Sequence, residues 1–338
     1  MTEASKRLSP LQLAAVMLCM SFSGLAAYRP EGAGLTAAAL GELLAAAGGF
    51  LLLLPLCLGR GGAAPLGRLR AGLGLGYLAF YLTVMLGDLA STVQYAFPRL
   101  YSTPAVIALT AAAGLYCASM GSRACGKTAC ASVITAAVCV LLIALGAAEH
   151  FRAVNIFLGA RPIEEVLSGL GAMAARSGEL AVFVLLLPES EGRPFKTAAV
   201  YSSVRGATGA GLLLFAKGVL GVLADSGQPV FLLSSASKTA VIERFDAALL
   251  LVWVLCTVTS CGAVLCAARA CLTAFKPDAP APLYRVGAFS ALCAAAAFAL
   301  FAGGKAAGFD SGAVPVASAA LLGMVVVSAC FAAMIRRK

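Results

Sequence analysis

Long apolar runs recur along the whole of this 338-residue chain, and they constrain its fold more than any other feature. Each run reaches about 20 residues, the length that an α-helix needs to cross the hydrocarbon core of a bilayer. The runs lie at residues 11–28, 35–58, 71–97, 103–120, 128–148, 171–188, 202–224, 246–268, 285–303 and 313–335. The sequence therefore predicts an all-α polytopic membrane protein with about ten transmembrane helices, in a single domain covering residues 1–338.

Charged residues make up only 12% of the chain, and its net charge is +10. The basic side chains stand singly between the apolar runs, whereas a nucleic-acid site needs them gathered on one face. With the N-terminus placed inside, the inner loops hold twice as many Lys and Arg residues as the outer loops, counting Arg205 as inner and Arg176 as outer. We therefore expect both termini in the cytoplasm, an even number of spans and no nucleic-acid partner.

No arrangement of residues is typical of an enzyme or of a metal centre. The twelve cysteines include no CxxC pair and no Cys/His cluster, and most of them lie inside apolar runs, where cysteine acts as a small apolar side chain. The single histidine, His150, has no Ser or Cys partner pattern nearby, and no Walker loop, HExxH or GxSxG motif occurs. We expect no catalytic activity, no metal and no cofactor.

Three charged residues within the predicted spans are candidates for a function, because a charge at bilayer depth is costly. Asp88, in the third span, is expected either to bind a cation, a substrate amine or a proton, or to make a structural hydrogen bond. Lys217, near the middle of the seventh span, is expected to replace a coupling sodium ion or to pair with a carboxylate such as Asp88. Glu42, near the outer end of the second span, is interpreted as a solvated interfacial acid.

Two spans contain small polar residues that weaken a helix. Glu179 follows Ser177 and Gly178 early in the sixth span, where an unwound turn would expose backbone groups to a cavity. The alternative is a carboxylate near the interface that is solvated from outside. In the first span, a break at residues 21–24 (SFSG) would point backbone N–H groups at an anion such as an amino-acid carboxylate, although the same residues also occur at ordinary helix crossings.

Three stretches of the chain carry a resemblance to a known family. Residues 8–13 (LSPLQL) run into the small-residue stretch 21–24, Gly178 and Glu179 precede residues 185–188 (LLLP), and residues 242–247 (IERFDA) lead to 252–254 (VWV). The family opens its first span with a similar Ser-Pro-x-Gln, carries a carboxylate in span six before a Leu-rich run ending in proline, and enters span eight through Ile-x-Arg-aromatic-acid followed by tryptophan. Over essentially its whole length the chain resembles the spore germination permeases, the B-subunits of GerA-type nutrient germinant receptors in the amino acid–polyamine–organocation transporter superfamily.

The resemblance implies a LeuT-like fold of two inverted five-helix repeats, about residues 8–150 and 160–338, with helices one and six broken at the midplane. It also implies a ligand site between the two breaks. Ser21, Ser23 and Gly24, with Phe22 beside them, would hold a ligand carboxylate. The amine and the side chain of the ligand would face Gly178, Glu179 and Phe183.

The function implied by the resemblance is that of a membrane subunit of a germinant receptor. It would bind a small nutrient, such as an amino acid, in the inner spore membrane or bacterial cell membrane and trigger germination through a population shift. Its partners would be an A-subunit, a lipoprotein C-subunit and the lipid bilayer. Two alternatives stay open: an ion- or proton-coupled amino-acid transporter of the same fold, and a non-transporting membrane scaffold or sensor partner.

Overall fold

A computed structural model describes residues 7–30, 34–58, 67–96, 102–159, 161–191, 194–238, 245–275, 281–302 and 314–335, and these residues are almost entirely helical. The helices are α1 (Pro10–Ala26), α2 (Leu35–Cys57), α3 (Arg68–Ala96), α4 (Thr103–Ser119), α5 (Ser122–Ala147), α6 (Pro162–Ala175), α7 (Glu179–Leu186), α8 (Pro194–Leu220), α9 (Pro229–Ala236), α10 (Phe245–Phe275), α11 (Leu283–Ala302) and α12 (Val314–Ile335). Both chain ends, residues 1–6 and 336–338, lie outside the described residues.

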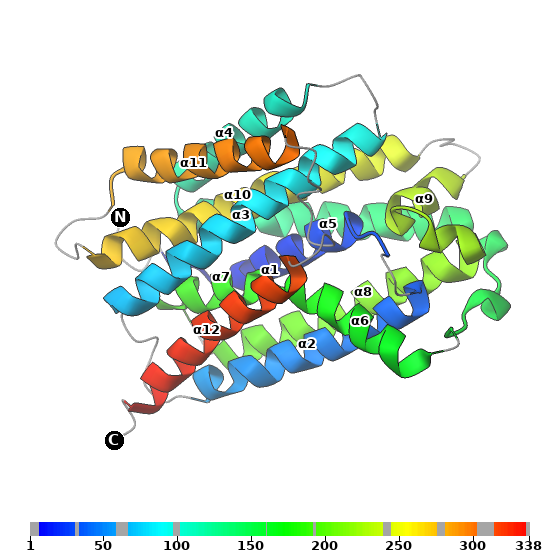
Figure 1. Ribbon diagram of the computed structural model, residues 1–338, viewed down its shortest axis with the longest axis horizontal. Coiled ribbons are helices and arrows are strands. Elements are labelled where there is room, and N and C mark those ends of the chain that lie inside the picture. The colour runs from blue at the N-terminus through cyan, green and yellow to red at the C-terminus, as the bar shows by residue number, and fades with distance from the viewer. Residues whose placement is uncertain are drawn as a thin grey trace.

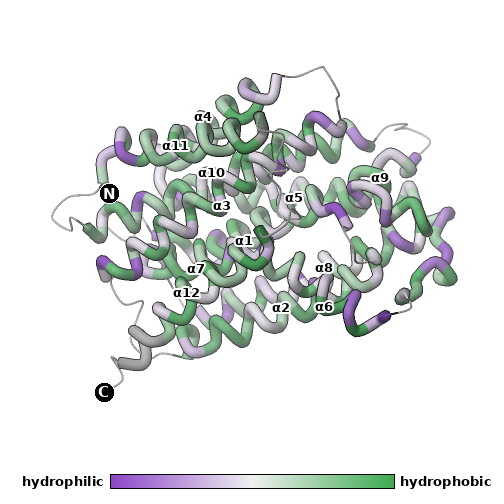
Figure 2. The backbone as a smooth tube through the Cα atoms, viewed as in Figure 1, coloured by the Kyte–Doolittle hydropathy of each residue, from purple (hydrophilic) through white to green (hydrophobic). Residues whose placement is uncertain are grey.

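Among the described residues, seven helical stretches are long and apolar enough to cross a membrane, which is the pattern of a multi-pass membrane protein. They are Leu35–Cys57, Arg68–Tyr95, Ser122–His150, Pro162–Glu189, Pro194–Asp225, Phe245–Phe275 and Leu283–Leu300. Three further apolar helices are shorter, so the number of ten crossings stays a prediction. Hydrophobic residues dominate the helices in Figure 2, and hydrophilic residues gather at many helix ends and in the loops.

Local sequence explains where several helices begin. Ser9 caps α1 in a capping box, since its hydroxyl accepts from the Gln12 backbone and the Gln12 side chain accepts from the Ser9 backbone. Pro10 occupies the first turn, where its missing N–H leaves no helical bond unmade. Pro162 begins α6 in the same way, with two acidic residues in the first turn. Helix α6 is the first half of a longer, interrupted apolar stretch, Pro162–Glu189.

The bundle is built from helices that are distant in sequence (Figure 1). The long helices α3 and α10 lie side by side, with α4 and α11 packed together on one flank. On the opposite flank α2 packs against both α6 and α8, while α1 lies among α5, α8 and α10. The short helix α7 contacts α1, α10 and α12, so it lies in the interior of the bundle.

Small residues let the helices approach closely. A Cβ added to Gly41 on α2 would lie 2.4 Å from the Gly169 carbonyl carbon on α6, and a Cβ on Gly169 would lie 2.7 Å from the Ala37 oxygen. Backbones in direct contact are typical of membrane helices, where no hydrophobic force pulls the helices together. This contact fixes α6 against α2 just before the chain turns inward.

The sixth span is interrupted at the predicted place. Helix α6 ends at Ala175 and α7 begins at Glu179, with residues 176–178 forming a non-helical joint between them. The prediction for the first span is wrong, because α1 continues through residues 21–24 to Ala26. Serine weakens a helix when its hydroxyl competes for backbone groups. In α1 the Ser23 hydroxyl instead bonds Thr257 of α10 at 2.8 Å, so that competition is absent.

Candidate functional site

A buried cluster of charged side chains joins α2, α7 and α8. Arg205 binds both carboxylate oxygens of Glu42, with Nε 2.7 Å from Oε1 and Nη2 3.0 Å from Oε2. Its Nη1 donates to Glu179 Oε1 and to the Tyr201 hydroxyl, the latter at 2.9 Å. The Tyr201 hydroxyl donates to the same Glu179 oxygen at 2.5 Å. The exposed fractions are 0% for Glu179, 2% for Glu42 and 4% for Arg205, so the cluster is removed from solvent.

Helix geometry brings these groups together. Tyr201 and Arg205 are four residues apart on α8 and therefore share a face. Gly209 lies one turn further on, and a Cβ there would approach Glu42 Cγ to 3.0 Å, so its absence lets α2 bring Glu42 close. Glu179 is the first residue of α7, where the positive end of the helix dipole favours a negative charge.

The joint between α6 and α7 is packed tightly. A Cβ on Gly178 would lie only 2.1 Å from the Tyr81 ring of α3, so this ring occupies the space that a larger residue would need. At the other end of the joint, the Arg176 guanidinium donates from Nε to the Gly24 carbonyl at 3.2 Å and lies over the Tyr28 ring. Its Nη2 is 3.8 Å from Asp88 Oδ2. The joint is thus tied to α1 by a hydrogen bond and to α3 by a second buried ion pair.

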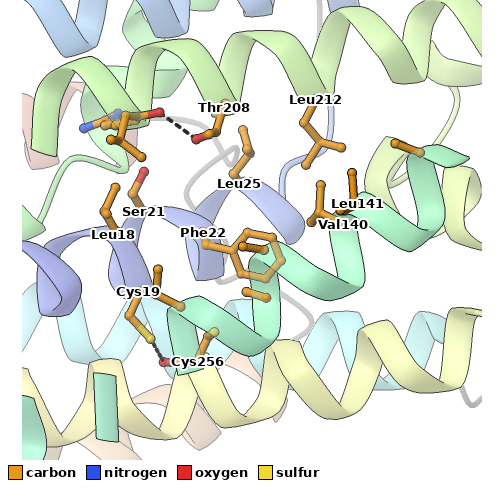
Figure 3. A pocket seen from close by; sticks show the side chains of 17 residues that line it. Leu18, Cys19, Ser21, Phe22, Leu25, Val140, Leu141, Thr208, Leu212 and Cys256 are labelled. Atoms are coloured by element: carbon orange, nitrogen blue, oxygen red, sulfur yellow. Dashed lines mark hydrogen bonds between the residues drawn. The ribbon is translucent and has the colours of Figure 1, made fainter. Parts of the chain in front are cut away.

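A cavity of about 340 Å³ lies beside the cluster, between α1, α5 and α8 with one residue of α10 at its base. In Figure 3 the Phe22 ring projects from α1 toward α5, and Thr208 and Leu212 point into the cavity from α8. Most of the lining is aliphatic or small, while Ser21, Thr208 and Arg205 supply its polar groups. Arg205 therefore belongs both to the cavity wall and to the buried ion cluster.

Two of the predicted ligand-binding residues, Ser21 and Phe22, line this cavity. Ser23 instead bonds Thr257, and its carbonyl accepts from Trp253 Nε1 at 3.0 Å. The bond to Trp253 joins two of the stretches that resemble the germination permeases. Residues 242–244 of the third stretch lie outside the described residues.

The other predicted ligand residues lie away from the cavity lining. Gly24 contacts Arg176, and Gly178 contacts Tyr81. Phe183 of α7 is fully buried in the hydrophobic core of the bundle. Glu179 reaches the cavity only through its ion pair with Arg205. The structure therefore divides the predicted site into a cavity, a buried cluster beside it and residues that hold the joint in place.

One expectation about charged residues is wrong, and the structure identifies the partners of two others. Glu42 is not a solvated interfacial acid, because it is buried against Arg205. Lys217 lies in the last turn of α8 and pairs with Asp225, which also accepts from the Leu35 backbone N–H at 2.8 Å. Asp88 pairs with Arg176 instead of Lys217.

Arg205 was not predicted to be a site residue, because its charge was counted with those of an inner loop. The structure places it well inside α8, since that helix begins at Pro194, eight residues before the predicted start of the span. Small and polar residues around it, such as Ser202 and Gly206, lowered the apparent hydropathy of this stretch. The two carboxylates that needed a buried partner were the signal that could have identified it.

No protein-family model matches the chain, and a search of characterised proteins finds no match either. The resemblance to the germination permeases therefore rests on the sequence motifs alone.

Proposed function

We propose that this chain is a permease-type membrane protein that binds a small solute in the cavity between α1, α5 and α8. The observation that carries the proposal is the position of Arg205, which lines an apolar cavity while it donates to Glu179 at a broken helix. Interrupted helices are a recurring feature of solute sites in transporters, because they leave polar backbone groups inside the bilayer. A cavity of this size, apolar with a few polar groups, suits a small ligand.

The pattern of helix contacts supports an inverted five-helix repeat. If α1 to α5 correspond to α6–α7, α8, α10, α11 and α12, most contacts occur in exchanged pairs. Helix α2 packs on α6 as α8 packs on α1, α4 on α10 as α11 on α3, and α5 on α10 as α12 on α3. Ten crossings with both termini in the cytoplasm complete this arrangement, in accord with the bias of Lys and Arg residues.

The two halves differ at the cavity. Helices α5 and α8 face each other across it, whereas their counterparts α12 and α2 are in contact. An alternating-access protein in one of its states is expected to be open between one pair of helices and closed between the equivalent pair of the other repeat. The cavity is thus the place where solute would enter or be held.

Nutrient sensing is the form of this function that the sequence resemblance favours, with an amino acid as ligand and germinant-receptor A- and C-subunits as partners. Coupled amino-acid uptake is the second candidate, and the ion cluster beside the cavity favours it. Uptake of labelled L-leucine into proteoliposomes separates the two. Flux driven by a proton or sodium gradient identifies a transporter, whereas saturable binding without flux identifies a receptor.

Filling the cavity is expected to abolish solute binding. Purified protein should show a higher thermal unfolding midpoint with apolar L-amino acids, because a ligand that binds only the folded state stabilises it. Ala144→Phe on α5 places a ring in the cavity and should remove this shift, reducing apparent affinity at least about tenfold, or about 1.4 kcal/mol.

The matched control is Ala131→Phe, an exposed position on the same helix that does not line the cavity. It should keep the full ligand-induced shift. If no amino acid shifts either protein, or if both variants lose the shift equally, the proposal fails and the scaffold interpretation gains.

A further inference from the structure

The described charges of the buried cluster do not balance. Glu42 and Glu179 bring two carboxyl groups, and Arg205 is the only cation that bonds to either of them in the described part of the chain. In the neighbouring part of the bundle, Arg176 pairs with Asp88. With both glutamates ionised, one negative charge would remain uncompensated in a water-excluded site, and this is the costly state inside a membrane protein.

The hydrogen bonds distinguish the two glutamates. Both oxygens of Glu42 accept from the guanidinium fork, an arrangement suited to an ionised carboxylate. On Glu179, Oε1 accepts from Tyr201 and Arg205, whereas the buried Oε2 has no hydrogen-bond partner among the described residues. A proton on Oε2 leaves every bond to Oε1 intact.

The described side chains that bond to Glu179, or to its partner Arg205, supply no second cation. Helix α8 contributes Tyr201 and Arg205, and α2 contributes Glu42. Helix α3 contributes the buried Tyr81, whose ring packs against Gly178 next to Glu179. A single proton needs only one acceptor oxygen, and Oε2 of Glu179 is a buried oxygen without a partner among the described residues.

We propose that Glu179 carries a bound proton on Oε2, and that this proton is the coupling ion of the solute site. The inference rests on the proposed membrane function and specifies its ion. With Glu179 neutral, the positive charge of Arg205 is balanced by Glu42 alone. When the proton leaves, Glu179 becomes a second anion for the same guanidinium on the cavity wall, so occupancy of Oε2 changes the charge beside the solute.

The test is infrared spectroscopy of the solute-free protein in lipid vesicles. Wild-type protein at neutral pH should show the C=O stretch of a protonated carboxylic acid, and this band should shift when glutamate is labelled with ¹³C at its carboxyl carbon. Glu179→Gln should lack the band. Glu42→Gln should also lose it, because a single remaining glutamate balances Arg205 and has no reason to hold a proton.

Glu164→Gln serves as control, since Glu164 is exposed on α6 and pairs with Arg161 at the surface. It should keep the band. A wild-type spectrum without a ¹³C-sensitive acid band overturns the proposal and needs no variant to fold. A band that persists in Glu179→Gln but disappears in Glu42→Gln places the proton on Glu42 instead of Glu179, and this result also overturns the proposal. Because no solute is present, these results are independent of whether amino acids bind.

Discussion

Replacing Arg205 by methionine is expected to cause the largest loss of stability of any single substitution in the buried cluster. The change leaves two buried carboxyl groups without their cation, and breaking a buried ion pair from one side costs roughly 3–5 kcal/mol. In detergent, the thermal midpoint should fall by about 5 °C or more. Trp253, the single and buried tryptophan, provides a fluorescence signal for the measurement.

The reason for the loss is tested by removing the charges together. Adding Glu42→Gln and Glu179→Gln to Arg205→Met should recover much of the midpoint, because no unpaired carboxylate is left. Arg161→Met is the matched control, since its pair with Glu164 is exposed and such surface pairs contribute about 1 kcal/mol or less. If the single Arg205 variant is as stable as this control, the cluster is not the electrostatic centre of the bundle.

Gly178→Ala is expected to have the second-largest effect, although it adds only one methyl group. The backbone at Gly178 is compatible with alanine, with φ at −61°, so the cost is steric. The new Cβ would meet the Tyr81 ring at 2.1 Å, and both groups are buried. Overpacking of this kind costs roughly 1–3 kcal/mol, and here it displaces the joint that positions Glu179. Both the thermal unfolding midpoint and the increase in this midpoint on adding ligand should be smaller in the variant.

Gly171→Ala provides the control, because Gly171 is exposed on α6 with no atom within 4 Å of an added Cβ. Alanine there should leave stability unchanged or raise it by roughly 0.5–1 kcal/mol, as expected for a helical site. A smaller side chain at Tyr81 should partly rescue Gly178→Ala. If Gly178→Ala and Gly171→Ala behave alike, the joint is looser than the structure implies.

The sequence was sufficient to predict the helices and one of the two proposed breaks. Apolar runs locate helices because crossing a bilayer requires about 20 apolar residues, and each predicted run falls on a helix. The break before Glu179 could be predicted because Gly178 is a weak helix former next to a charge. The same reasoning failed at residues 21–24, where Thr257 of α10 bonds Ser23 and removes the competition with the helix.

Charge partners could not be predicted, because pairing depends on helices that are distant in sequence. Glu42 and Arg205 are 163 residues apart and meet only because α2 packs on α8. Asp88 was the acid suggested for Lys217, but its partner is Asp225 at the end of the same segment. Arg205 falls inside the predicted run 202–224 but was counted with the charge of an inner loop, since hydropathy registers the cost of a charge but not the counter-ion that offsets it.

The most direct test of the solute site is an experimental density map of the protein in lipid nanodiscs with saturating L-leucine. The account predicts density for the amino acid between Phe22 and Thr208, within reach of Arg205, with the chain still non-helical between Ala175 and Glu179. An acyl chain filling the cavity, or an unbroken helix through residues 176–178, would contradict it.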